Sequence, residues 1–182
     1  MSGQSVAVPA RHGGNAFIRT VHAISTACGW IAAGLLVASL IVTCEMIYSR
    51  GILGNSTIWQ TETVIYFVIA AICIGLSYVQ LMRGHVNVEL LPMMMSPSTR
   101  KVWAIVLMLA TIGVVALMCW YSFDVLHQSW RRNWKSPSVW APPLWPVWAA
   151  VTLGFGLLLL QLIADFYALL RGIDAPFSLE EK

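Results

Sequence analysis

The chain has 182 residues, of which 58% are hydrophobic and only 10% are charged, and its formal net charge at pH 7 is +3. Soluble domains carry about 25% charged residues, so a water-soluble fold could not cover this much apolar surface. The mean hydropathy of +0.73 indicates that lipid is the solvent. The small net charge, without a basic run interleaved with aromatics, excludes a nucleic-acid groove.

The segment before the first apolar run falls into two parts. Residues 1–14 are polar and contain glycines, so we expect a flexible N-terminus there. Four apolar residues then recur at helical spacing, namely Phe17, Ile18, Val21 and Ile24. The polar Arg19 and His22 between them favour an amphipathic N-terminal arm that lies on the membrane. A plain N-terminal extension of the first span fits the same pattern equally well.

Four long runs without charged residues follow, at residues 24–44, 63–82, 102–123 and 144–164. Each is about 20 residues long, and a helix of that length spans the roughly 30 Å of the hydrocarbon core. Backbone N–H and C=O groups find no water at that depth, so each run must be helical. The sequence therefore predicts an all-α integral membrane protein with four transmembrane helices. We place the spans at about residues 24–47, 61–82, 102–124 and 144–168. They lie within a membrane domain of residues 15–171, and residues 172–182 form a cytoplasmic tail.

The distribution of Lys and Arg predicts how the chain crosses the membrane. With the N-terminus inside, the inner segments hold Arg11, Arg19, Arg83, Arg100, Lys101, Arg171 and Lys182. The outer loops hold Arg50, Arg131, Arg132 and Lys135. Because cytoplasmic segments are usually richer in these residues, we expect both termini in the cytoplasm. The basic residues of the third loop lie on the unexpected side, which suggests a function for them.

The third loop begins with a charged group at the end of the third span. Asp124, His127 and Arg131 share one helix face if the third helix continues outward, and Arg132 and Lys135 extend this group. One interpretation is a solvated helix end, which is what most charge runs are. The other is a docking surface for an acidic partner outside the cytoplasm, and the sequence leaves both open.

Few other residues indicate chemistry. Pairing with Arg50 or contact with headgroup water explains Glu45 at the outer end of the first span. His22 and His85 fall near the inner face, but neither lies inside an apolar run, which argues against a pair of haem ligands. The chain also lacks metal-ligand spacing, a nucleotide-binding loop and a nucleophile with a base, so we expect no cofactor and no enzyme. The residues alone favour a small helical bundle that supports another protein.

A set of residues between the first span and the second loop resembles a known family. The set comprises Arg50, the Asn55-Ser56 turn, Trp59, Glu62, Gly75 and the run Arg83-Gly84-His85-Val86-Asn87-Val88-Glu89. Together with the four-span layout, it resembles the small permease subunit of tripartite ATP-independent periplasmic (TRAP) transporters, the DctQ-like family. The family often has Asp where this chain has Glu89, and a second acid beside Glu62.

This resemblance implies a non-enzymatic subunit of a secondary transporter that imports an organic acid, a carboxylate, on a sodium gradient across a bacterial inner membrane. The implied partners are a large permease subunit, a periplasmic substrate-binding protein and membrane lipids. The large permease would hold the substrate and sodium sites, and this chain would be its scaffold.

The resemblance also implies roles for single residues. Trp59 and Glu62 would order the outer start of the second span. The loop that follows this span would be fixed against headgroups or the partner by Arg83, His85, Asn87 and Glu89. The proposed periplasmic docking residues would be Arg131, Arg132 and Lys135.

Two other functions stay open at this point. One is a haem- or quinone-binding membrane anchor of an oxidoreductase, which a visible-range absorbance spectrum distinguishes from an uncoloured protein. The other is an autonomous small exporter, which reconstitution of the chain alone distinguishes from a subunit.

Overall fold

The computed structural model describes residues 16–82 and 97–170, and within these residues it contains four α-helices and no named strand. The helices are α1 (Ala16–Gly51), α2 (Gln60–Leu81), α4 (Pro97–Arg131) and α5 (Trp145–Leu170). All four are long and apolar enough to cross a membrane. The predicted all-α class with four spans is therefore confirmed.

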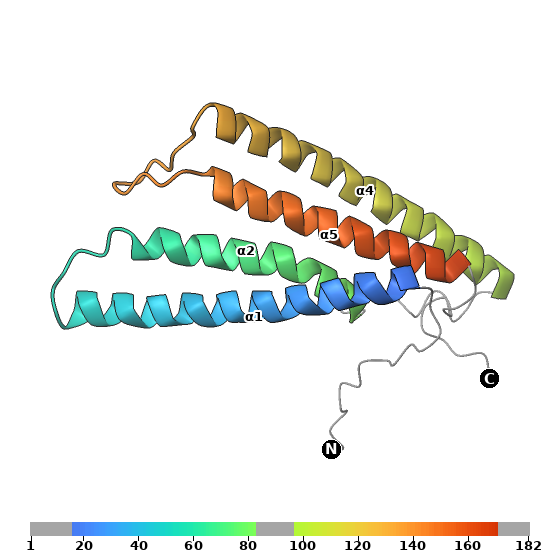
Figure 1. The fold of residues 1–182 in the computed structure, drawn as a ribbon, viewed down its shortest axis with the longest axis horizontal. Coiled ribbons are helices and arrows are strands. Elements are labelled where there is room, and N and C mark those ends of the chain that lie inside the picture. Colours follow the sequence, from blue (N-terminus) through green and yellow to red (C-terminus); the bar gives the residue numbers. More distant parts are fainter. Residues whose placement is uncertain (1–15, 83–96, 171–182) are drawn as a thin grey trace, which may run out of the picture.

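The helices lie side by side in a row with the order α1, α2, α5, α4 (Figure 1). α2 packs between α1 and α5, α4 packs on α5, and α1 also makes a smaller contact with α5. Short connections force neighbours in the chain to run in opposite directions. The α1–α2 and α4–α5 connections consequently lie at one end of the row (Figure 1), which we call the loop end. We call the opposite end, where α1 and α4 begin and α2 and α5 finish, the terminal end.

The predicted arm is helical, and it is continuous with the first span. α1 begins at Ala16 and runs unbroken for 36 residues, so of the two alternatives the structure has the N-terminal extension. Ile18 and Val21 are buried inside the row rather than turned toward a lipid surface. The stretch contains no proline or glycine before Gly29 that would turn the chain away from the helix axis. Residues 1–15, with the predicted flexible N-terminus, lie outside the described residues.

Small residues bring the helices close together. Gly29 of α1 faces the ring of Tyr78, and a Cβ at Gly29 would lie 2.5 Å from that ring. Gly75 of α2 faces Ala32, and Gly154 of α5 lies against the backbone of Cys73. Such positions let membrane helices approach closely, which compensates for the lack of a hydrophobic driving force between helices in lipid.

α4 is attached to the row along a single stripe. One set of its less exposed residues recurs at alternating spacings of four and three from the middle of the helix to the loop end: Met108, Ile112, Val115, Cys119, Ser122, Leu126 and Ser129. This is the period of a left-handed coiled-coil contact. Val115 forms a buried cluster with Leu158 and Leu162 of α5. Most of the remaining surface of α4 is exposed.

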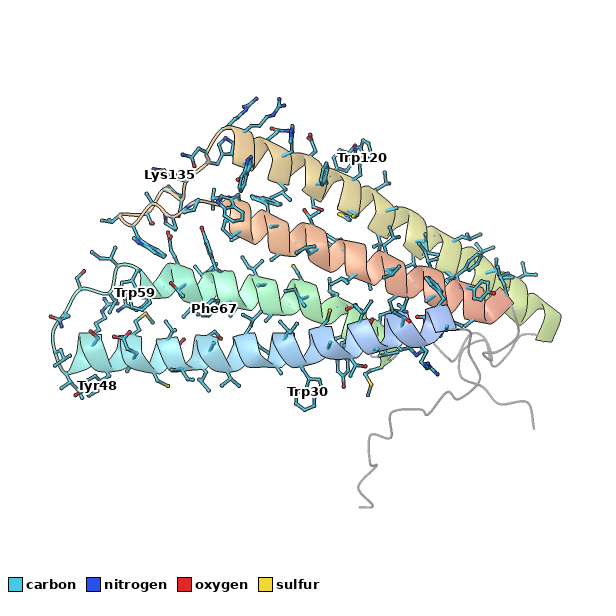
Figure 2. The ribbon with its side chains drawn as sticks, viewed as in Figure 1. Trp30, Tyr48, Trp59, Phe67, Trp120 and Lys135 are labelled. Atoms are coloured by element: carbon cyan, nitrogen blue, oxygen red, sulfur yellow. The ribbon has the colours of Figure 1, made fainter. Side chains whose placement is uncertain are left out.

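The outward surfaces of the row are apolar. Trp30 of α1 is 77% exposed and Trp120 of α4 is 74% exposed, and both point away from the row (Figure 2). Exposed leucine, isoleucine and valine side chains surround them along the spans. Large exposed apolar surfaces on long apolar helices are expected where acyl chains replace water. The chain is a multi-pass membrane protein.

Candidate functional site

The α4–α5 loop, residues 132–144, folds back on itself at the loop end. Trp134 N–H donates to the carbonyl of Ser129 at 3.1 Å, and Leu144 N–H donates to the carbonyl of Trp134 at 2.9 Å. Ser136 N–H donates to the carbonyl of Pro142 at 2.9 Å. Lys135 and Pro143 form an isolated antiparallel β-bridge. The two halves of the loop are thus paired through their backbones.

Two residues of this loop adopt left-handed backbone conformations. Asn133 has a φ of 48° and Ala141 has a φ of 47°. Asparagine tolerates this region, whereas an alanine there costs about 1–2 kcal/mol. The Ala141 N–H donates to both the carbonyl and the hydroxyl of Ser138, at 3.1 and 3.2 Å, which offsets part of this cost. Strain of this kind persists where surrounding contacts determine the conformation.

Two side chains of α2 supply such contacts. Ser136 Oγ donates to Glu62 Oε1 at 2.6 Å, and Tyr66 Oη donates to the carbonyl oxygen of Pro143 at 3.0 Å. Glu62 and Tyr66 are four residues apart, so both lie on the face of α2 that meets the loop. We call these two hydrogen bonds the loop anchor.

The Glu62 side chain is buried, with only 9% of it exposed. It lies in the first turn of α2, where unpaired backbone N–H groups favour a negative charge by about 0.3–1 kcal/mol. Its second oxygen, Oε2, is sealed from solvent and has no hydrogen-bond partner in the described part of the chain. The helix dipole alone does not require this burial, and the contact that accompanies it is the hydrogen bond from Ser136 of the loop.

A second group of polar contacts joins the ends of α1 and α2. Gln60 Nε2 donates to Glu45 Oε2 at 3.3 Å, and Thr61 Oγ1 lies 3.6 Å from Met46 Sδ. Glu45 is exposed and therefore open to headgroup water, and the side-chain hydrogen bond that it accepts comes from Gln60 rather than from Arg50. Arg50 is exposed in the last turn of α1. The starting turns of α2 therefore contact α1 on one side and the α4–α5 loop on the other.

The structure brings some of the predicted motif residues together and leaves others apart. Trp59 directly precedes α2, is half exposed and makes no side-chain cap. It lies with Glu62 at the loop end (Figure 2). Arg50 lies across the α1–α2 connection from them. The remaining motif residues, Arg83, His85, Asn87 and Glu89, lie outside the described residues.

The three basic docking candidates lie together at the loop end. Arg131 closes α4, Arg132 follows it directly, and Lys135 lies in the loop (Figure 2); all three are exposed. α4 does continue outward to Arg131, as the shared face of Asp124, His127 and Arg131 required. Asp124 accepts a hydrogen bond from Gln128 at 2.8 Å. The edge-to-face rings of Trp130 and Trp145, 4.9 Å apart, hold the end of α4 against the start of α5.

A polar network that sequence reasoning missed joins three helices near the terminal end. Ser25 Oγ donates to Gln161 Oε1 at 2.8 Å, and Gln161 Nε2 donates to Asp165 Oδ1 at 2.9 Å. Gln80 Nε2 donates to Asp165 Oδ2 at 3.2 Å. Gln161 has no exposed surface. The four side chains come from α1, α2 and α5, so they hold these helices together where each leaves its apolar run.

A weak sequence signal for this network existed. Gln161 and Asp165 are one helical turn apart, at positions that share a face, and polar residues in a span are rare without partners. The described residues contain no group of three or more His, Cys, Asp or Glu side chains that could hold a metal ion.

Apolar outer surfaces, helices joined by close contacts and paired polar groups at both ends define a small helical-bundle membrane protein. Residues 39–172 match the family described as "Tripartite ATP-independent periplasmic transporters, DctQ component". The chain belongs to this family and is a component of a transporter. No curated protein and no solved structure matches it.

Proposed function

We propose that this chain is the scaffold subunit of a TRAP transporter that imports an organic acid, a carboxylate, using a sodium gradient. The chain would bind the large permease subunit, which would carry the substrate and sodium sites. The observation that carries the proposal is the way the family's four spans are joined. Close helix contacts lie between two sets of interhelical hydrogen bonds, and this arrangement supports a static role for the four helices.

The polar network at the terminal end supports this division of roles. A carrier needs polar side chains or broken helices that face a solute pathway. Here Ser25, Gln80, Gln161 and Asp165 are directed at one another across helix boundaries. Their hydrogen bonds stabilise the packing of α1, α2 and α5.

The proposed membrane is the bacterial inner membrane, with both termini in the cytoplasm. The excess of Lys and Arg in the inner segments supports this orientation. It puts the loop end on the periplasmic side. The loop after α2, with Arg83, His85, Asn87 and Glu89, would then face the cytoplasm and fix that side against headgroups or the large permease.

The basic docking surface, formed by Arg131, Arg132 and Lys135, would face the periplasm and receive an acidic surface of the substrate-binding protein. All three side chains are exposed and project from the end of α4 and the loop. The α4 C-terminus favours nearby cations, which explains two of the three as a local effect. Lys135 lies beyond the helix, so the dipole does not account for its place.

The test is purification of the tagged chain from its native membrane in a mild detergent, followed by reconstitution. We expect a large hydrophobic permease to co-purify, and uptake of an organic acid to require both subunits, the binding protein and a sodium gradient. Transport by this chain alone in liposomes would overturn the proposal. So would a haem absorbance in the purified chain, because that would make it an oxidoreductase anchor.

A further inference from the structure

We propose that Glu62 is a positioning residue for the docking surface: through the loop anchor it fixes Lys135 and the loop tip relative to Arg131 and Arg132. This inference rests on the proposed docking of the binding protein at those basic residues. The proposal connects the family motif around Trp59 with the basic residues of the third loop. The hydrogen bond that joins them is between Glu62 and Ser136, which are 74 positions apart in the chain.

The two hydrogen bonds of the loop anchor hold both sides of the backbone pair that contains Lys135. Ser136, which donates its hydroxyl hydrogen bond to Glu62, is the next residue after Lys135. Pro143, whose carbonyl accepts from Tyr66, is the residue that bridges with Lys135. Movement of this backbone pair away from α2 therefore breaks at least one of the two hydrogen bonds.

The basic residues differ in how they are held. Arg131 belongs to α4, and the Arg132 N–H still donates to the carbonyl of Gln128 at 2.9 Å, so the helix positions both. Lys135 comes after Asn133, where the left-handed backbone turns the chain out of the helix. It is the one of the three that depends on contacts from elsewhere in the fold.

The tip of the loop, which includes Val139 and Trp140, lies between the two backbone segments that pair at Lys135 and Pro143. Val139 is 88% exposed, and Trp140 next to it is about half exposed. The left-handed Ala141 that follows them is strained on its own. The hydrogen bonds that fix the loop segments on either side keep such a tip in one conformation. The loop anchor consequently presents an apolar tip and Lys135 as one preformed surface.

Preformed surfaces bind more tightly because less conformational freedom is lost on association. Loss of the anchor should therefore weaken the apparent affinity for the binding protein while it leaves the later steps of transport unchanged. A residue that only stabilised the fold would instead lower the amount of active transporter and its maximal rate.

The experiment compares variants in which the acceptor, the donor or the charge is changed. Glu62→Leu removes the acceptor, Ser136→Ala removes the donor, and Glu62→Gln keeps an acceptor oxygen. Glu45→Leu is the matched control, because it removes a carboxylate at the same end that contacts Gln60 of α2 and not the loop. A triple charge reversal at Arg131, Arg132 and Lys135 tests the docking surface itself.

Two measurements are made on each variant, assembled with the large permease in liposomes. The first is the distance distribution between spin labels placed at the exposed Val139 and Leu53, one in each described loop. The second is the binding-protein concentration that gives half-maximal uptake, together with the maximal rate. Ser136 lies in the loop and outside the helices, so Ser136→Ala keeps the test usable if Glu62→Leu fails to fold.

We expect Glu62→Leu and Ser136→Ala to broaden the distance distribution and to raise the half-maximal concentration about three- to tenfold, with an unchanged maximal rate. Glu62→Gln should restore most of both properties, and Glu45→Leu should change neither. An unchanged distance distribution in Glu62→Leu and Ser136→Ala would overturn the inference. The inference would also be overturned if the charge reversal raised the binding-protein concentration for half-maximal uptake while Glu62→Leu and Ser136→Ala left it normal. If the charge reversal itself has no effect, the docking proposal fails, and the distances still decide whether Glu62 holds the loop.

Discussion

Gly154 of α5 lies so close to the carbonyl group of Cys73 on α2 that a Cβ on Gly154 would overlap the backbone of its neighbour. A backbone cannot move aside as the end of a flexible side chain can. The contact between the two middle helices of the row is therefore set by the absence of one methyl group.

This contact predicts that Gly154→Ala destabilises the chain. The added methyl must push α2 and α5 apart, which typically costs about 1–3 kcal/mol and exceeds the gain of up to about 1 kcal/mol in helix propensity. Gly156→Ala is the matched control, because a Cβ there meets nothing within 4 Å. Thermal unfolding in detergent should show a lower midpoint for the first variant and an equal or higher midpoint for the second. Equal midpoints for both would show that α2 and α5 are not in close contact at Gly154.

The polar network at the terminal end predicts a second stability effect. Asp165→Leu leaves the amide N–H groups of Gln80 and Gln161 without their acceptor, which should cost about 1–3 kcal/mol. Asp165→Asn retains one acceptor oxygen and should cost less. The exposed Asp124→Asn serves as the control, since the hydrogen bond of Asp124 comes from Gln128 on its own helix and joins no other helix among the described residues. The measurement is again the unfolding midpoint, and a Leu variant as stable as the Asn variant would contradict the role of the network.

The proposed orientation predicts which side a reagent can reach. Cysteines introduced at Val139 and Leu53, both exposed at the loop end, should react with a membrane-impermeant maleimide added to the periplasmic side of intact cells. The native Cys28 is buried among the helices and should stay unlabelled, whereas the native Cys44 is exposed and is first replaced by serine so that it gives no signal. Labelling of the introduced cysteines only after the membrane is broken open would place the loop end in the cytoplasm and reverse the assignment.

The basic docking surface predicts a dependence on salt. Interactions between exposed charges are screened beyond about 10 Å at 0.1 M ionic strength and beyond about 3 Å at 1 M. The binding-protein concentration for half-maximal uptake should therefore rise steadily as potassium chloride is added at fixed sodium. The triple charge reversal should flatten or invert this dependence. A salt response identical in the two proteins would remove these residues from docking.

The spans themselves could be predicted because they follow from a strong physical constraint. A run of about 20 apolar residues has no stable form in lipid other than a helix. All four runs are helical, and α1 and α4 extend beyond the predicted limits of about 24–47 and 102–124. Polar residues can continue a helix into the headgroup layer, so the end of an apolar run does not mark the end of a helix.

The neighbours of each helix could not be predicted in the same way. In water an apolar stripe identifies the packed face, but in lipid the packed and the exposed faces are both apolar. Small residues recur at a spacing of four within α1, at Gly29 and Ala33, and within α2, at Ala71 and Gly75. In the structure Gly29 packs on Tyr78, Gly75 faces Ala32 and Ala71 is buried, whereas Ala33 is exposed. The spacing therefore marks packed positions but does not reveal the partner of each.

The contacts that define the candidate site join residues far apart in the chain. Glu62 was recognised from its place in a motif, and the serine that binds it comes 74 positions later in a loop without a pattern. Gln80 and Asp165 are separated by 85 positions. Such pairs depend on α2 and α5 being adjacent, which a single sequence does not reveal. Whether the motif residues have the roles assigned to them stays a prediction.

The single-file order of the helices has a consequence for movement in the bilayer. If another membrane protein covers one broad side of the row, the opposite side still faces acyl chains. The complex of the two proteins then has a larger circumference in the membrane plane than the partner alone. Viscous drag on rotation and tilting rises with that circumference. If the proposed scaffold role holds, a body that turns slowly and resists tilting would serve as the static part against which a moving part of the large permease crosses the bilayer.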